Sequence, residues 1–285
     1  EGLPVAATIP GRESEVAAPT QLPADAQGCT LRPGAVGTVA RILDGETVLL
    51  DDGQKVRLIG ALAPRAEDAG AAADAWPPEV AAVRLLTGLV LGRSVRLAYG
   101  SATRDRYGRQ LAHLFVVGDG GDVWVQGEML RQGAARAYGL PNIFDCAAEL
   151  LAHERVARDS GGGIWANRLY QAVAADQTGE LMQRRSRFAI VRGTVKNVAR
   201  TKAAVYLNFG DDWKSDFTAR IDRRIVAAHP AFDRTLDRLA GRPVEVRGWI
   251  ERRNGPLIDI ADPSQIAVED DATPAAARQP ADSRV

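Results

Sequence analysis

Short runs of apolar or alternating apolar and polar residues occur between positions 39 and 59, and turn residues separate them. The runs are Val39–Ile42, Thr47–Leu50 and Lys55–Ile59, with Asp44-Gly45 and Asp51-Asp52-Gly53 between them. Such alternation is typical of half-buried strands, and an Asp-Gly pair is a strong hairpin signal. The pattern predicts three strands joined by two tight hairpins.

Two more strands and three helices are predicted over the following hundred residues. The strands are Ser94–Tyr99 and Leu111–Val117, and the helices cover about 76–91, 123–132 and 144–159. Apolar residues three and four positions apart define the faces that we expect to pack inward. They are Val80, Val83, Leu86 and Val90 in the first helix, and Leu150, Leu151 and Val156 in the third.

The pattern becomes β again in the second half of the chain. Strands are predicted at Phe188–Val195, Ala204–Phe209 and Ser215–Ile221, then a helix near Ala231–Ala240, then strands at Val244–Trp249 and Leu257–Ile260. A long first strand, a hairpin, a helix and a final hairpin follow one another in an OB-type barrel. The second half is therefore predicted to be a small OB-like β domain.

These patterns divide the chain into five parts. We expect a disordered leader over 1–35, a first domain over 36–168, a linker of lower order over 169–186, an OB-like domain over 187–268 and a disordered tail over 269–285. The leader and the tail are rich in Ala and Pro and have no useful periodicity, which is typical of disorder. At 285 residues and 46% hydrophobic composition, the chain can bury two cores.

Charge is distributed unevenly, although the net charge is zero. Residues 181–261 hold seventeen Lys or Arg against nine Asp or Glu, whereas 36–168 hold fifteen against sixteen. Attraction to a polyanion therefore belongs to the second half. No apolar run approaches the ~18 residues of a membrane span.

The first hairpins also place candidate chemistry together. Asp44 and Glu46 lie at one bend, and Arg57 lies on a returning strand. Two carboxylates and a guanidinium on adjacent strands could bind a divalent cation and a phosphate. Two acidic turn residues with a surface ion pair would give the same pattern, and for the hairpin alone this second interpretation is favoured.

Five sequence blocks in order resemble the staphylococcal nuclease (thermonuclease) family, from about Gly37 to Trp165. They are the DGET of 44–47, the VRLIGALAP of 56–64, the DRYGR of 105–109, the CAAE of 146–149 and the GIW of 163–165. The resemblance implies a calcium-dependent nuclease fold, an OB-type five-stranded barrel packed by three helices. The complete fold class is then mixed α+β, mainly β with helices, and ends in the second, OB-like barrel.

The resemblance also implies roles for single residues. Arg57 and Arg109 match the two arginines that hold the phosphate, and Arg106 with Tyr107 matches a pair that contacts the nucleotide. Asp44 and Glu46 match acidic positions at the metal.

Two positions of the family's site are substituted. Leu62 stands where the family has a metal-ligating Asp, and Arg65 stands where it has the Glu that acts as general base. The site should therefore bind calcium weakly or not at all and cleave poorly, unless Glu67 or Asp68 replaces the lost acid.

Two cysteines, Cys29 and Cys146, permit one disulfide or two free thiols. The resembled family is largely exported, and an oxidising compartment favours the disulfide. The chain starts at Glu1 without a methionine. We expect an exported protein, periplasmic or secreted, whose signal peptide is already absent.

The basic second half offers its own candidate partners. Basic and aromatic side chains of this region could line a groove for single-stranded nucleic acid. They are Arg247, Trp249, Arg252 and Arg253, with Tyr206, Phe209 and Trp213 on the other sheet. The hypotheses are a weak or inactive nuclease that binds nucleic acid or nucleotide phosphates, mainly through 187–261, and a non-catalytic envelope scaffold of two barrels.

Overall fold

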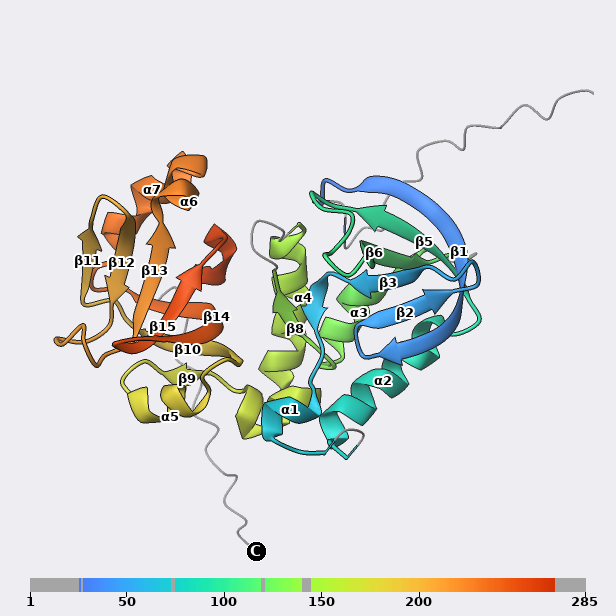
Figure 1. The fold of residues 1–285 in the computed structure, drawn as a ribbon, viewed down its shortest axis with the longest axis horizontal. Coiled ribbons are helices and arrows are strands. Elements are labelled where there is room, and N and C mark those ends of the chain that lie inside the picture. Colours follow the sequence, from blue (N-terminus) through green and yellow to red (C-terminus); the bar gives the residue numbers. More distant parts are fainter. Residues whose placement is uncertain (1–25, 27, 73–74, 119–120, 140–144, 270–285) are drawn as a thin grey trace, which may run out of the picture.

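A computed structural model of the chain describes residues 26, 28–72, 75–118, 121–139 and 145–269. Figure 1 shows two lobes, the first from blue to green and the second from yellow to red. All of the predicted tail except Glu269, and most of the predicted leader, lie outside the described residues. None of the described helices is long and apolar enough to cross a membrane.

The first lobe is a closed five-stranded barrel. Its strands run in the order β3-β2-β1-β5-β6, and a parallel pairing of β3 with β6 closes the sheet. The strands are β1 (Arg32–Asp44), β2 (Thr47–Leu50), β3 (Lys55–Leu58), β5 (Ser94–Tyr99) and β6 (Gln110–Val116). The predicted strands are therefore confirmed, but β1 begins within the stretch predicted to be a mobile leader.

Two short strand pairings accompany the barrel: one extends its sheet and the other forms a separate two-stranded sheet. β7 (Val123–Trp124) pairs with β6. β4 (Gly60–Leu62) leaves the barrel and pairs with β8 (Arg136–Tyr138) on the side of the second lobe. Leu62 lies opposite Arg136 in this pairing, a position that matters for the site.

The helices pack near their predicted positions but with shifted faces. They are α2 (Pro77–Val90), α3 (Val125–Arg131) and α4 (Ala147–Ser160), and a further short helix that was not predicted is α1 (Ala66–Ala69). Val80 and Val156 were predicted to face inward and are exposed. The inward positions are Ala82, Leu86 and Val90 in α2, and Leu150, Glu154 and Ala157 in α4. The prediction failed because Ala and Glu residues occupy part of the inner face of each helix. A search for large apolar residues at helical spacing does not detect these positions.

A disulfide joins Cys29, just before β1, to Cys146, directly before α4, with 4.8 Å between their Cα atoms. The bond closes a loop of 117 residues in sequence separation. It ties the start of the barrel to its last helix. Both cysteines are buried.

The second lobe is a curled, barrel-like sheet with its own core. Its strand order is β11-β12-β13-β15-β14-β10-β9, with β16 also paired to β14. β10 pairs with β14 and β11 pairs with β12, although only Val195 and Lys196 separate β10 from β11. β10 and β11 follow each other in sequence but lie near opposite ends of this strand order. The sheet must therefore curl to bring its two ends close together. The elements are β10 (Phe188–Thr194), β11 (Asn197–Arg200), β12 (Ala204–Asn208), β13 (Thr218–Asp222), α6 (Arg223–Ala228), α7 (Pro230–Leu236), β14 (Pro243–Arg253), β15 (Gly255–Ile260) and β16 (Ile266–Val268).

The segment predicted to be a linker of lower order has structure. It contains β9 (Val173–Ala174), which pairs with β10, and α5 (Thr178–Gln183). Val173 and Leu181 are buried in the core of the second lobe. The prediction was wrong because the apolar residues of this segment are few and pack against partners far along the chain.

Candidate functional site

Glu46 is the carboxylate at the centre of the first lobe's candidate site. It lies in the turn between β1 and β2 and is only 2% exposed. The turn needs Gly45, because a Cβ there would lie 2.7 Å from the Cβ of Ala63. The turn between β1 and β2 thus lies close to the loop after β4, and the two segments enclose the Glu46 side chain.

Two guanidinium groups share one oxygen of Glu46. Its Oε2 accepts hydrogen bonds from Arg57 at 2.9 Å and from Arg65 at 3.1 Å. Its Oε1 accepts from the amide of Ala63 at 3.1 Å. Burial raises the pKa of Glu46, and the two arginines oppose that rise, Arg65 more than Arg57. The carboxylate therefore sits in a cage of cationic and amide donors.

The loop from Asp105 to Arg109 forms a second, more exposed cluster. Arg109 Nε donates to Asp105 Oδ2 at 2.6 Å, and Asp105 Oδ1 accepts from the amides of Tyr107 and Arg109. Burial works to raise the pKa of Asp105, but these bonds outweigh it and lower the pKa. Tyr107 is 68% exposed, with the Arg106 guanidinium 4.8 Å from its ring centre. Tyr107 and Arg109 line a hollow of about 240 Å³ together with Lys55.

Asp68, one of two candidate replacement acids, is hydrogen-bonded to partners other than Glu46. Its Oδ2 accepts from the amide of Arg65 at 3.2 Å, from Arg136 at 3.2 Å and from the Tyr170 hydroxyl at 3.4 Å. Glu67 is exposed on α1, and its side chain makes no hydrogen bond or ion pair with the described residues. Neither carboxylate is hydrogen-bonded to the side chains that bind Glu46, and the Asp68 carboxylate bonds to Arg65 only at its main-chain amide.

The sequence of the chain is similar to those of known nucleases. The family model "Staphylococcal nuclease homologue" matches residues 55–167. An "Uncharacterized endonuclease" of Escherichia coli O157:H7 is 33% identical over 135 residues, which cover 46% of this chain and 77% of that protein. The chain belongs to the staphylococcal nuclease family. A "Thermonuclease" of Staphylococcus intermedius is 34% identical over 106 residues, which are 36% of this chain and 60% of that protein.

The residues at the family's site do not fit a calcium ion. Calcium takes six to eight oxygen ligands, but Leu62 offers none and is buried. The Oδ1 of Asp44 accepts from the Glu46 amide at 2.7 Å, and Arg65 takes the Glu46 oxygen that a cation would need. Among the described residues, no group of three or more His, Cys, Asp or Glu could hold a metal.

The structure of the second lobe contradicts two of the predicted contacts with nucleic acid. Arg247 is buried and bonds to Glu154 and Glu245, so it cannot reach a strand of nucleic acid. Phe209 packs against Phe217 in the core. The alternation of polar and apolar residues along β14 does not tell which face of the strand is exposed to solvent. In the structure, the first lobe covers the face that carries Arg247.

Trp249 stands apart from the other aromatic residues of the predicted groove. It lies near Tyr138 and Phe188, where the two lobes meet. It therefore belongs to the edge of the contact between the lobes.

Three of the predicted contacts do meet in one groove of about 540 Å³. Tyr206, Trp213 and Arg253 line it. Trp213 is more than half exposed, and Arg253 is paired with Asp259 at 3.2 Å. Arg252 is exposed nearby on β14. The groove is also lined by Asn197, Asn208 and Asn254, to which no pattern in the sequence pointed.

Proposed function

We propose that this thermonuclease-like protein binds nucleotide phosphates without calcium and hydrolyses nucleic acid weakly or not at all. The observation that carries the proposal is the 3.1 Å bond from Arg65 to Glu46. It places a fixed positive charge beside the carboxylate that calcium would otherwise neutralise. The Arg65 side chain is 44% exposed, so part of its guanidinium also faces solvent. Guanidinium groups suit phosphate because they stay charged and form forked bonds.

The same substitution opposes catalysis. A guanidinium cannot accept a proton from the attacking water, and a lost general base typically lowers the rate by about 10²–10⁴. Export to an oxidising compartment is part of the proposal. The bond between Cys29 and Cys146 supports it, because disulfides persist in such compartments.

Binding of a nucleoside 3′,5′-bisphosphate in the presence of chelator tests this proposal. Arg65→Ala should weaken binding by roughly 10- to 100-fold, because a hydrogen bond to a charged group contributes about 1.5–3 kcal/mol. The matched control is Arg131→Ala, since Arg131 is paired with Glu128 on the surface of α3. Calorimetry on the three proteins measures the effect. Binding that requires calcium would exclude metal-free phosphate recognition, and metal-free binding that Arg65→Ala leaves unchanged would exclude Arg65 as the residue that carries it. No binding under either condition would leave the scaffold hypothesis.

A second candidate function is single-strand binding by the groove of the second lobe. The exposed ring of Trp213 beside Tyr206 supports it. Stacking of a base on an aromatic ring contributes about 1–3 kcal/mol. Trp213→Ala should therefore weaken binding of a short single-stranded oligonucleotide by roughly 5- to 100-fold, and Trp213→Phe should retain most of it. Fluorescence anisotropy measures the affinity of each protein for the oligonucleotide. Equal affinities of the native chain and both variants would show that the groove does not bind it.

A further inference from the structure

We infer that the second domain docks on the substituted half of the site and holds Arg65 in place beside Glu46. Here the second domain means β9 to β16, and the substituted half means Leu62 and Arg65. The inference rests on the proposed function only for what Arg65 would bind. The docking itself follows from contacts within the chain.

The first contact is apolar and contains Leu62. This side chain is 4% exposed and belongs to a buried cluster that also includes Phe188 and Ile190 of β10. The remaining buried members come from α4 and the segment after it, and they are Ala157, Ile164, Trp165 and Tyr170. The position that would carry a metal-ligating Asp is therefore part of the contact between the two domains.

The second contact is polar and leads to Arg65. Arg136 of β8 is buried and donates to the carbonyl of Phe188 at 3.0 Å and to Asp68 at 3.2 Å. The same Asp68 oxygen accepts from the amide of Arg65. Arg136 thus links β10 of the second domain to the loop that carries Arg65. Its guanidinium also lies over the rings of Tyr170 and Phe188, at 4.9 and 5.3 Å.

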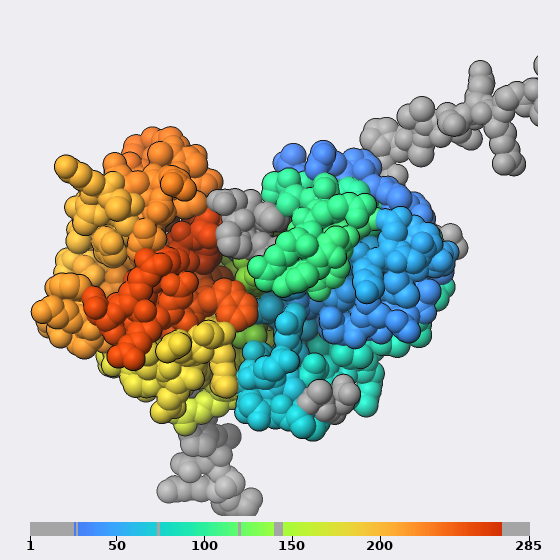
Figure 2. Space-filling view, viewed as in Figure 1, coloured from blue at the N-terminus to red at the C-terminus, as the bar shows by residue number. Residues whose placement is uncertain are grey.

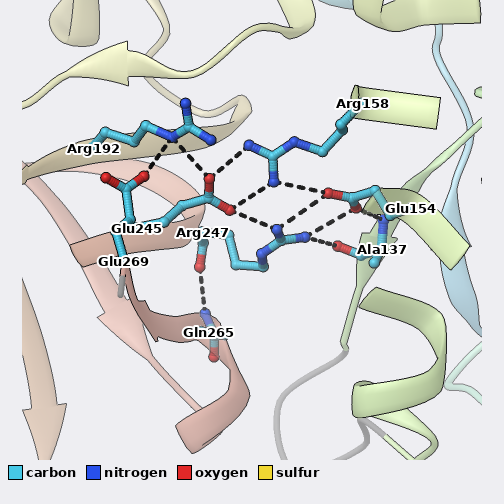
Figure 3. Close-up of polar contacts among 8 residues, drawn as sticks. All are labelled: Ala137, Glu154, Arg158, Arg192, Glu245, Arg247, Gln265 and Glu269. Atoms are coloured by element: carbon cyan, nitrogen blue, oxygen red, sulfur yellow. Dashed lines mark hydrogen bonds and ion pairs between the residues drawn. The ribbon is translucent and has the colours of Figure 1, made fainter. Parts of the chain in front are cut away.

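A buried ion-pair network holds the next residue of β8. Figure 3 shows Arg247 between Glu154 of α4 and Glu245 of β14. Arg247 donates to Glu154 at 3.0 and 3.1 Å, to Glu245 at 2.7 Å and to the carbonyl of Ala137 at 3.2 Å. The amide of Ala137 donates to Glu154 at 2.5 Å. Both Arg136 and Ala137 are therefore bonded to the second domain.

These contacts form one path from the second domain to the site. β8 pairs with β4, which ends at Leu62, and Arg65 follows three residues later. In the view of Figure 2, the surface of the second domain meets the first around the cyan segment that contains α1. A shift of the Arg65 loop would have to break the Asp68 bonds or expose the cluster around Leu62. The docked domain thus keeps the loop in the arrangement that excludes a cation.

Amide hydrogen exchange in the full chain tests this inference. Arg247→Gln loosens the docking without touching a residue of the Arg65 loop. We expect the amides of residues 65–71 to exchange at least tenfold faster than in the native chain, together with those of 136–138. The control is Arg200→Gln, because Arg200 is bonded to Asp233 and Asp237 on another face of the second domain. That variant should leave residues 65–71 unchanged.

Two outcomes would overturn the inference. One is faster exchange in β10 and β14 with no change at 65–71, and the other is equal acceleration by the control. If Arg247→Gln does not fold, Phe188→Leu supplies the same comparison by trimming the apolar cluster. Bisphosphate affinity, measured on the same samples, separates the two proposals. A chain that binds no bisphosphate but shows coupled exchange retains the docking and loses the proposed function.

Discussion

Arg247→Met should lower the free energy of unfolding of the full chain by about 1.5–3 kcal/mol, because two buried carboxylates lose charge-assisted hydrogen bonds, although Arg158 stays paired with both of them. Glu154 would lose two hydrogen bonds while remaining buried, and Glu245 would lose one. Denaturant unfolding at pH 7 measures the loss. Arg200→Met is the matched control, since its ion pairs are exposed and such pairs contribute about 0–1 kcal/mol. A loss no larger than the control's would mean that the network does not join the domains energetically.

The same network gives the protein a characteristic acid sensitivity. Burial works to raise the pKa of Glu245, but Arg158, Arg247 and Arg192 outweigh it and lower the pKa to about 2. The folded-state pKa is thus below the ordinary value of 4.5. Its stabilising contribution is present above about pH 4.5 and is lost as the pH falls toward 2. Glu245→Gln should remove this part of the pH dependence.

The double substitution Leu62→Asp with Arg65→Glu should create calcium-dependent cleavage. It returns a ligand and a general base, and a positioned base typically contributes about 10²–10⁴ in rate. We expect cleavage of single-stranded DNA with calcium to rise at least about 100-fold above the native chain, and chelator to abolish it. The single variant Leu62→Asp, which keeps Arg65, is the matched control and should stay inactive. A folded double variant that binds calcium without cleaving would show that more than these two positions is missing.

The double variant should also depend on calcium for its stability. An unpaired carboxylate at position 62 would be buried in the cluster that contains Phe188 and Ile190, and burying a charge without a partner is costly. Calcium binding to the folded state would offset this cost. Thermal unfolding with calcium and with chelator should therefore differ for this variant and coincide for the native chain.

Local chemistry made the first barrel predictable. The hairpins between β1, β2 and β3 depend on Asp-Gly turns, and the confirmed turn geometry includes Gly53 at a φ of 82°. β11 was missed because Asn197–Arg200 is short and half polar. The inner faces of α2 and α4 were misplaced where Ala82 and Glu154 replace the large apolar residues that a periodic pattern detects.

The site could be predicted only as far as its parts share one hairpin. Glu46 directly precedes β2, which pairs with the strand that carries Arg57, and the structure brings the two side chains together as the turn and register suggest. The contacts of Arg136 and Arg247 could not be found, because their partners lie 52 to 110 residues away in the other domain. Alternating polar and apolar residues indicate that a strand has two different faces, but they do not indicate which other part of the protein covers each face.

The most direct test of the central claim is a nuclease assay of the native chain with calcium and with chelator, alongside Glu46→Ala and Arg109→Ala purified in parallel. The account predicts little or no cleavage, identical with and without calcium and unchanged by either substitution. Robust calcium-dependent cleavage that either substitution abolishes would contradict it, and would show that Arg65 leaves the Glu46 carboxylate when calcium and substrate bind.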